Sequence, residues 1–178
     1  MTPIQLFTPR LVLREIIDTD LPNIFRGLSH PDVIRYYGVS YSTLEETKDQ
    51  MAFYARIRME NTGIYWVVCS TQGEFIGAGG LNNIHPLHRK AELGLWILPE
   101  YWGQGLMKEA IDAICEYGFS KRNLHRLEGW VETENTACVR GLEKSGFVKE
   151  GVLHDAEWKN NRFISLAVYA RLAPEAKP

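Results

Sequence analysis

The stretch from Ala91 to Phe119 constrains this chain most strongly. It opens with A-E-L-G-L-W-I-L, an apolar run with the alternation of a β-strand, and Pro99 ends the strand because proline cannot donate to a sheet ladder. From Met107 onward the apolar residues recur at helical spacing. The residues G-Q-G-L at 103–106 therefore predict a glycine turn that leads from a strand into the N-terminus of a helix.

Such a turn suits an anion. The free N–H groups of a first helical turn and the positive end of the helix dipole favour negative charge, and two glycines let the backbone approach a ligand closely. A pyrophosphate would fit, although a turn that needs glycine only for its dihedral angles is the alternative. The dinucleotide-binding fingerprint G-x-G-x-x-G is excluded because Lys108 holds its third glycine position, and the phosphate loop G-x-x-x-x-G-K-[ST] is absent.

The composition is that of one ordinary globular domain. The 178 residues are 45% hydrophobic and 24% charged, and no linker, repeat or low-complexity tract divides them. We therefore expect a single domain over residues 1–178, with its core at about 8–172.

Charge and cysteine usage limit the partners. A net charge of −2 gives no basic field for nucleic acid, and no apolar run is long enough to cross a membrane, so neither partner is expected. The first ten residues lack the basic flank and apolar block of a signal peptide. Cys69, Cys115 and Cys138 stand alone, which argues against a metal site and a disulfide and for a reducing compartment. We expect a cytoplasmic protein without a metal.

Hydrophobic periodicity predicts the order of the remaining elements. A strand at 11–16 and a helix at 21–28 come first, and a second helix follows a capping box at 42–45 and ends near Gly63. The chain continues with hairpin strands at 64–69 and 74–81, a loop at 82–90, a strand at 127–132, a helix that opens at 133–136 and ends near 146, and closing strands at 147–153 and 163–170 around a polar turn at 159–162.

Three sequence blocks, in this order, carry a resemblance to a known family. They are I-G-A-G-G-L, then A-E-L-G-L-W-I-L-P-E-Y-W-G-Q-G-L-M-K-E-A, then E-N-T-A-C-V-R-G-L-E-K-S-G-F. With them the chain resembles the GNAT family of N-acetyltransferases, and within it the RimJ/RimL group. The resemblance covers nearly the whole chain. It implies an α+β fold with a single mixed, mostly antiparallel sheet of about seven strands, flanked by about four helices, with a V-shaped splay between the central strands.

The resemblance implies acetyl-CoA as the cosubstrate. Main-chain N–H groups around the glycine turn would hold the pyrophosphate, namely those of Gly103, Gln104, Gly105, Leu106, Met107 and Lys108. The strand residues Trp96, Ile97 and Leu98 would hydrogen-bond the pantetheine arm and give an oxyanion donor to the thioester. Asn135 matches a family asparagine that contacts the cofactor, and a helix N-cap is its alternative role. Trp102 and Met107 depart from the family pattern at the turn.

Acetyl transfer to an ammonium needs a base for its proton and gains from an acid at the departing sulfur. Glu92 resembles in position the strand glutamate that serves as the base in some relatives, and an edge carboxylate in water is the alternative. Many relatives use a tyrosine acid at the position of Leu142, whereas the RimJ/RimL group carries a serine where this chain has Cys138. Cys138 is therefore the candidate acid, and a small core residue is its alternative role.

The sequence leaves several classes of acceptor open. Subgroup resemblance favours a protein N-terminal α-amine, with a ribosomal protein as one candidate. A small amine, such as a polyamine, amino acid or aminoglycoside, is the alternative, and so is a non-catalytic acyl-CoA-binding domain of the same fold. Tyr36 and Tyr37 could line a substrate groove or cover a core edge. Exposed strand edges would permit a homodimer.

Overall fold

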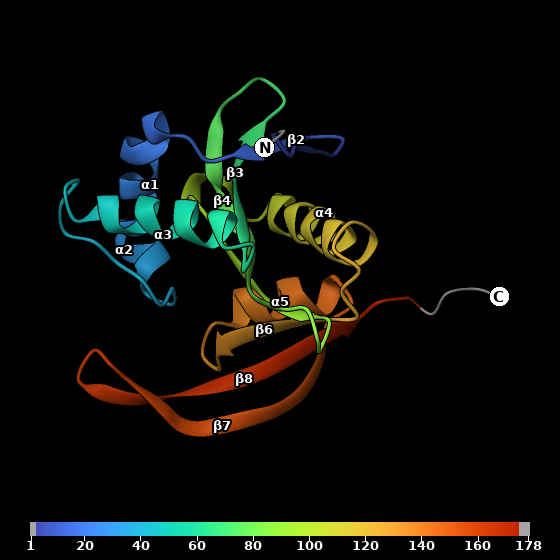
Figure 1. Cartoon of the computed structure of the whole chain (residues 1–178). Helices are drawn as coiled ribbons and strands as arrows, with labels where there is room; N and C mark the ends of the chain where they lie inside the picture. Colours follow the sequence, from blue (N-terminus) through green and yellow to red (C-terminus); the bar gives the residue numbers. More distant parts are fainter. Residues whose placement is uncertain (1–2, 175–178) are drawn as a thin grey trace.

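One mixed sheet organises the molecule. The computed structural model describes residues 3–174, and within that range eight strands lie in the order β1-β2-β3-β4-β5-β6-β8-β7 (Figure 1). All neighbouring strands are antiparallel except β5 and β6. The strands are β1 (Leu6–Phe7), β2 (Leu11–Glu15), β3 (Ile64–Ser70), β4 (Phe75–His85), β5 (Lys90–Ile97), β6 (Arg126–Glu132), β7 (Val148–Lys159) and β8 (Arg162–Leu172).

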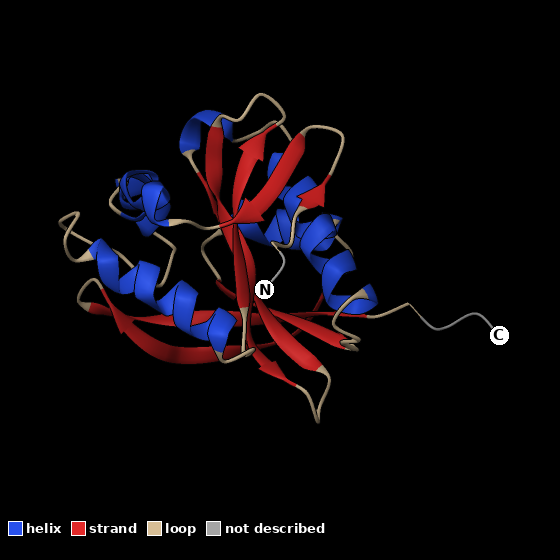
Figure 2. Ribbon diagram, turned by 45° about the horizontal axis from the view of Figure 1, so that its top comes forward, coloured by secondary structure: helices blue, strands red, loops and turns tan. Residues whose placement is uncertain are grey.

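Helices cover both faces of this sheet (Figure 2). In the described part of the chain they are α1 (Leu21–Leu28), α2 (Pro31–Ile34), α3 (Thr47–Met59), α4 (Leu106–Ser120) and α5 (Thr136–Lys144). The α+β class, the mixed and mostly antiparallel sheet and the splay of the central strands are thus confirmed, with one strand and one helix more than expected.

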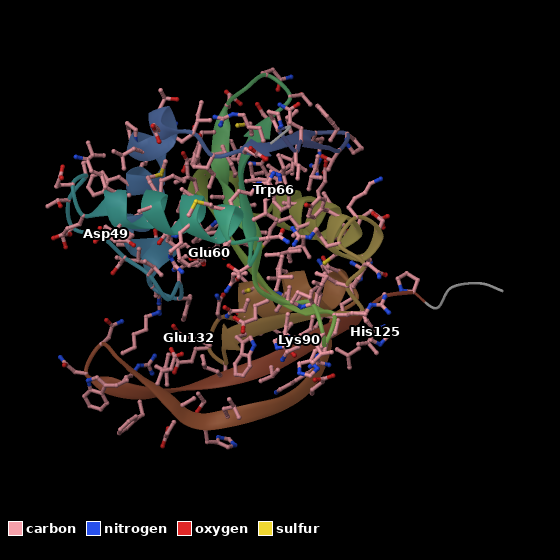
Figure 3. All side chains as sticks on the ribbon, in the orientation of Figure 1. Asp49, Glu60, Trp66, Lys90, His125 and Glu132 are labelled. Atoms are coloured by element: carbon pink, nitrogen blue, oxygen red, sulfur yellow. The ribbon has the colours of Figure 1, made fainter. Side chains whose placement is uncertain are left out.

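Each helical layer encloses a core of its own. The main core lies under α4 and α5 and includes Trp66, whose ring meets Tyr117 of α4 edge-on at 5.0 Å (Figure 3). The second core lies on the opposite face, where Ile24 of α1 and Tyr54 of α3 surround Trp96 of β5. The strands between them are buried on both faces, which explains their nearly continuous apolar sequence.

The turns explain where prediction and structure differ. Helix α3 begins at Thr47, and its N-cap, Glu46, has no side-chain capping bond. The capping bonds lie one residue later than expected and precede the helix: Glu46 N–H donates to Thr43 Oγ1 at 3.1 Å, and Ser42 N–H donates to Glu46 Oε2 at 2.9 Å. The closing strands run on to a two-residue turn at Asn160 and Asn161, both with positive φ. Strand β4 extends into the first four residues of the expected 82–90 loop, because Asn82 and His85 keep pairing with β5.

The sheet divides between β5 and β6. These parallel strands pair only at their beginnings, Lys90–Glu92 with Arg126–Glu128, and then separate. Lys90 and His125, labelled in Figure 3, mark the end at which the strands are still close. Beyond it β5 follows β4, whereas β6 follows β8. The remainder of β5 therefore has a hydrogen-bonded strand on one side only.

Candidate functional site

The glycine turn has the geometry that the sequence predicts. Gly103 and Gly105 have φ of 75° and 77°, the left-handed region that favours glycine. Gly105 is the N-cap of α4 and no side chain caps this helix, so its first N–H groups keep no side-chain partner. A β-carbon on Gly103 would meet nothing within 4 Å, and one on Gly105 only Arg10 Nη2 at 3.6 Å. The backbone here is open to a ligand.

A cation holds this turn in place. Arg10 donates from Nη1 to Gln104 O at 2.9 Å and from Nε to Glu109 Oε2 at 2.7 Å. Burial alone would raise the pKa of Glu109, and hydrogen bonds from Thr8 and Arg10 outweigh it, so that the pKa is lowered. Arg10 thus places a guanidinium beside the expected pyrophosphate site. Sequence reasoning missed it because Arg10 lies 94 residues from Gln104.

Met107 and Lys108 turn their side chains away from the approach to the glycines. A β-carbon at Gly141 of α5 would lie 3.5 Å from Met107 Sδ, which places the thioether between α4 and α5. Lys108 pairs with Asp112 at 2.5 Å. Leu106 is buried in the main core. The departure from the family pattern at Met107 is therefore a packing contact between two helices.

The gap between β5 and β6 exposes main-chain groups. Leu98 N–H donates to Ile76 O at 2.9 Å, whereas Arg89 O accepts from His125 N–H at 2.6 Å. Because successive residues of a strand point their main-chain groups to opposite sides, even-numbered residues of β5 bond β4 and odd-numbered ones face the gap. The residues with main-chain groups on the gap are Leu93, Leu95 and Ile97.

Of the three strand residues expected to hold a pantetheine arm, Ile97 alone has this orientation. Its carbonyl accepts from Trp102 Nε1 at 2.7 Å, so its N–H is the group that remains. Trp102, the second departure from the family pattern, thereby ties the glycine turn to the end of β5. Trp96 directs its ring into the second core, where a β-carbon on Gly27 would lie 2.0 Å from it.

Glu92 lies where β5 and β6 begin to separate. It is half-buried, and its Oε2 accepts from Asn82 Nδ2 at 3.5 Å. Tyr65 donates to Asn82 Oδ1 at 3.4 Å, and a β-carbon on Gly94 would lie 2.1 Å from this hydroxyl. Burial raises the pKa of Tyr65, so the phenol stays protonated at neutral pH. The carboxylate of Glu92 and the hydroxyl of Tyr65 thus lie on the same face of the sheet at the gap.

Asn135 and Cys138 approach from the opposite face. Helix α5 packs there against Gly129 of β6, and Asn135 Oδ1 accepts from Cys138 N–H at 3.1 Å, so Asn135 is the N-cap of α5. Within residues 3–174 nothing accepts from its Nδ2, which leaves that group for a ligand. Burial raises the pKa of Cys138 to about 11. Its thiol is therefore protonated at neutral pH and can donate a proton.

A wide cavity of about 730 Å³ lies on the Glu92 face, between the segment around α2 and the β7–β8 hairpin. Three carboxylates and two cations line it, an excess of one negative charge. Glu132, labelled in Figure 3, lies between the hairpin and the helical layer. The lining residues are Pro31, Asp32, Ile34, Arg35, Tyr36, Tyr37, Gly38, Ser40, Trp130, Glu132, Glu157, Trp158, Lys159, Asn160 and Leu166.

Over residues 3–174, no three His, Cys, Asp or Glu side chains gather closely enough to hold a metal ion. None of the helices in that part of the chain has the length and apolarity needed to cross a membrane.

This chain is similar to a known protein family and to known proteins. The model of the acetyltransferase (GNAT) domain matches residues 10–148. The N-acetyltransferase YoaA of Bacillus subtilis (strain 168) is 38% identical over 176 residues, which cover 98% of this chain and 99% of YoaA.

Two solved structures represent two kinds of acceptor. Spermidine N-acetyltransferase from Vibrio cholerae, in complex with CoA and spermine, is 28% identical with a TM-score of 0.84, over 93% of this chain and 96% of that one. RimL, a ribosomal L7/L12 alpha-N-protein acetyltransferase in complex with coenzyme A, is 20% identical with a TM-score of 0.86, over 95% and 98%. At that identity the likeness to RimL concerns the fold.

The family match spans most of the chain, and the sheet, the gap and the glycine turn agree with it. The chain belongs to the GNAT family of N-acetyltransferases.

Proposed function

We propose that this N-acetyltransferase transfers the acetyl group of acetyl-CoA to the N-terminal α-amine of a protein. The observation that carries acetyl transfer is the gap between β5 and β6 next to an uncapped glycine turn. A strand with free main-chain groups suits the amide-bearing pantetheine arm, and a helix N-terminus suits the pyrophosphate. Both fit one extended ligand.

Each end of this ligand has protein groups to hold it. The pyrophosphate would lie against the N–H groups of residues 103–108, with Arg10 beside them. The pantetheine arm would pair with Leu95 and Ile97, and the Ile97 N–H is the candidate oxyanion donor because its carbonyl is already bonded. Asn135 Nδ2 would contact the arm from the α5 side.

The proton transfers follow from the two faces of the gap. Glu92, on the cavity face, would take a proton from the acceptor ammonium directly or through water. Cys138, on the α5 face, would give a proton to the departing sulfur. The amine would attack the thioester directly, since a thiol with a pKa of about 11 is a poor nucleophile at neutral pH.

Replacing Cys138 with alanine should lower kcat by about tenfold and leave acetyl-CoA binding unchanged, because a weak acid contributes less than a matched one. The thiol keeps its proton well above neutral pH, so the loss should be equal at pH 7 and pH 9. Initial rates of CoA release measure it, with Cys115→Ala as a matched control from the main core. An unchanged kcat removes Cys138 from the mechanism.

The acceptor proposal rests on the shape and charge of the cavity. It is open and wide, and its nearly balanced charge does not demand a polycation. Glu132 lies four positions beyond Glu128, the partner of Glu92, which is about 13 Å along a strand. An extended peptide with its amine at Glu92 could therefore reach the cavity. A small amine is the second candidate, favoured by the likeness to the Vibrio cholerae spermidine enzyme.

Two measurements test the proposal in sequence. Acetyl-CoA at about 100 times its Kd should add about 2.7 kcal/mol, a rise of about 5 to 10 °C in the unfolding midpoint for a domain of this size. Acetylation is then followed by mass spectrometry on peptides with free or blocked N-termini and on small amines. Product on free N-termini alone supports the proposal, whereas product on small amines alone selects the second candidate.

A further inference from the structure

One ammonium group lies in the cavity on the Glu92 face, namely the side-chain ammonium of Lys159. Lys159 Nζ donates to a carboxylate oxygen of Glu132, to Arg35 O at 2.9 Å and to Tyr37 O at 3.4 Å. An ammonium has three donors, and here each one has an acceptor. The side chains are well covered, with 21% of Lys159 and 8% of Glu132 exposed. A primary alkylammonium is therefore bound in this cavity by three oxygens.

The backbone fixes this lysine in place. Lys159 is the last residue of β7 and pairs with Arg162 across the two-residue turn, so its main chain cannot shift freely. Its acceptors at Arg35 and Tyr37 lie 124 and 122 residues away in the chain. In Figure 1 the hairpin correspondingly reaches toward the helices α1 to α3. Lys159 therefore connects the β7–β8 hairpin to the segment at 35–37, the two walls of the cavity.

The contact also determines what charge the cavity offers. Glu132 is the most buried carboxylate of the lining, and Lys159 neutralises it. A second ammonium on an acceptor would have to displace Lys159 or lie beside a like charge in a partly desolvated space. The two remaining carboxylates, Asp32 and Glu157, are exposed. They hold a cation weakly because water screens them.

We infer that Lys159 is a specificity residue, which occupies an ammonium site and thereby excludes acceptors with a second cationic amine in favour of acceptors with one. The inference rests on the proposed function in one respect, namely that acceptors enter this cavity. It argues against assigning the substrate of the spermidine-acetylating relative to this chain, because Lys159 occupies the position that the second ammonium of a diamine would take. An N-terminal peptide with neutral residues after its amine meets no such competition.

Matched amines test this inference. n-Alkylamines and α,ω-diamines of equal chain length differ in one ammonium, and binding of each is measured by calorimetry with CoA present. The wild type should bind the monoamine of each pair at least as tightly as the diamine, because Lys159 repels the second ammonium. Lys159→Met keeps the length of the stem and removes the charge, and it should bind the diamine at least about tenfold more tightly than the monoamine. Glu132→Gln with Lys159→Met should lose that preference.

Lys149→Met is the control, since Lys149 is an exposed lysine of the same strand outside the cavity lining. A wild type that already prefers diamines overturns the inference, and so does a Lys159→Met variant without the gain. If that variant does not fold, Lys159→Gln replaces it with the same expected order, because its amide is neutral and leaves the charge of Glu132 uncompensated. Calorimetry with CoA measures amine binding and needs no acetyl transfer. A failure to acetylate any amine therefore contradicts the proposed function and leaves this test intact.

Discussion

Replacing Glu92 with glutamine should lower kcat by about 10²- to 10⁴-fold at pH 7, the usual contribution of a positioned general base. Glutamine keeps the size of the side chain and its contact with Asn82, but it cannot accept the proton of an ammonium. Acetyl-CoA binding should stay within about twofold, because Glu92 lies on the acceptor face of the sheet. Initial rates with an N-terminal peptide and calorimetry with acetyl-CoA measure the two effects.

The pH dependence separates a base from a structural residue. A peptide α-amine has a pKa of about 7.7 to 8.0, so it is largely neutral at pH 9 and no longer has to lose a proton before it attacks. The defect of Glu92→Gln should therefore shrink by about six- to tenfold between pH 7 and pH 9, as the neutral fraction of the amine rises. It should persist for a lysine-like alkylamine, which titrates near 10.4. A defect of constant size with the peptide would contradict the role of Glu92 as a base.

Glu128 supplies the control for this prediction. It pairs with Glu92 across β5 and β6, yet hydrogen bonds from Arg126 and Lys90 occupy its carboxylate. Burial would raise the pKa of Glu128, but these bonds outweigh it and lower the pKa. Glu128→Gln should reduce the unfolding midpoint and leave kcat within about threefold, since its carboxylate is committed to the two cations.

Replacing Gly105 with alanine should raise the Kd for acetyl-CoA by about ten- to a hundredfold, or about 1.4 to 2.8 kcal/mol. The new β-carbon would stand where the pyrophosphate approaches the first N–H groups of α4. The left-handed φ of 77° adds strain of about 1 to 2 kcal/mol, which lowers the unfolding midpoint as well. Titration calorimetry and thermal unfolding measure the two effects.

Gly73 allows strain and binding to be separated. It lies in the β3–β4 turn with φ of 89°, and a β-carbon there would meet nothing within 4 Å. Gly73→Ala should therefore lose about as much stability as Gly105→Ala while its Kd for acetyl-CoA stays the same. If the two variants bind acetyl-CoA equally well, the turn at Gly105 does not hold the cofactor.

Local patterns in the sequence were sufficient for most elements and for the turn, but they did not predict the short β1 and α2. The helical spacing after Met107 and the pair Gly103 and Gly105 gave the start of α4 to within one residue. The start of α3 was harder, because the pairs Ser42–Glu45 and Thr43–Glu46 form two overlapping capping patterns. Pairing with a neighbour extended β4 and β7 beyond what their own residues indicate.

The candidate site could be predicted only in part, because it is assembled across long separations. Glu92 is identified by its strand, but the direction of main-chain groups in β5 depends on its pairing with β4, which points Leu98 N–H away from the gap. Arg10 and Lys159 carry no local motif. Their hydrogen-bond partners Gln104 and Arg35 lie 94 and 124 residues away in the chain.

The order of the strands has a consequence for how the protein is made. Strands β1 to β5 pair in the order of the chain, so this half of the sheet can form while the rest is still being synthesised. Strand β8 lies between β6 and β7, so β7 has no strand to join until the last described strand is complete. We therefore expect the cavity proposed for the acceptor, which this hairpin lines on one side, to be the last part of the site to form during synthesis. A nascent chain could then bind its cofactor before it can recognise an acceptor.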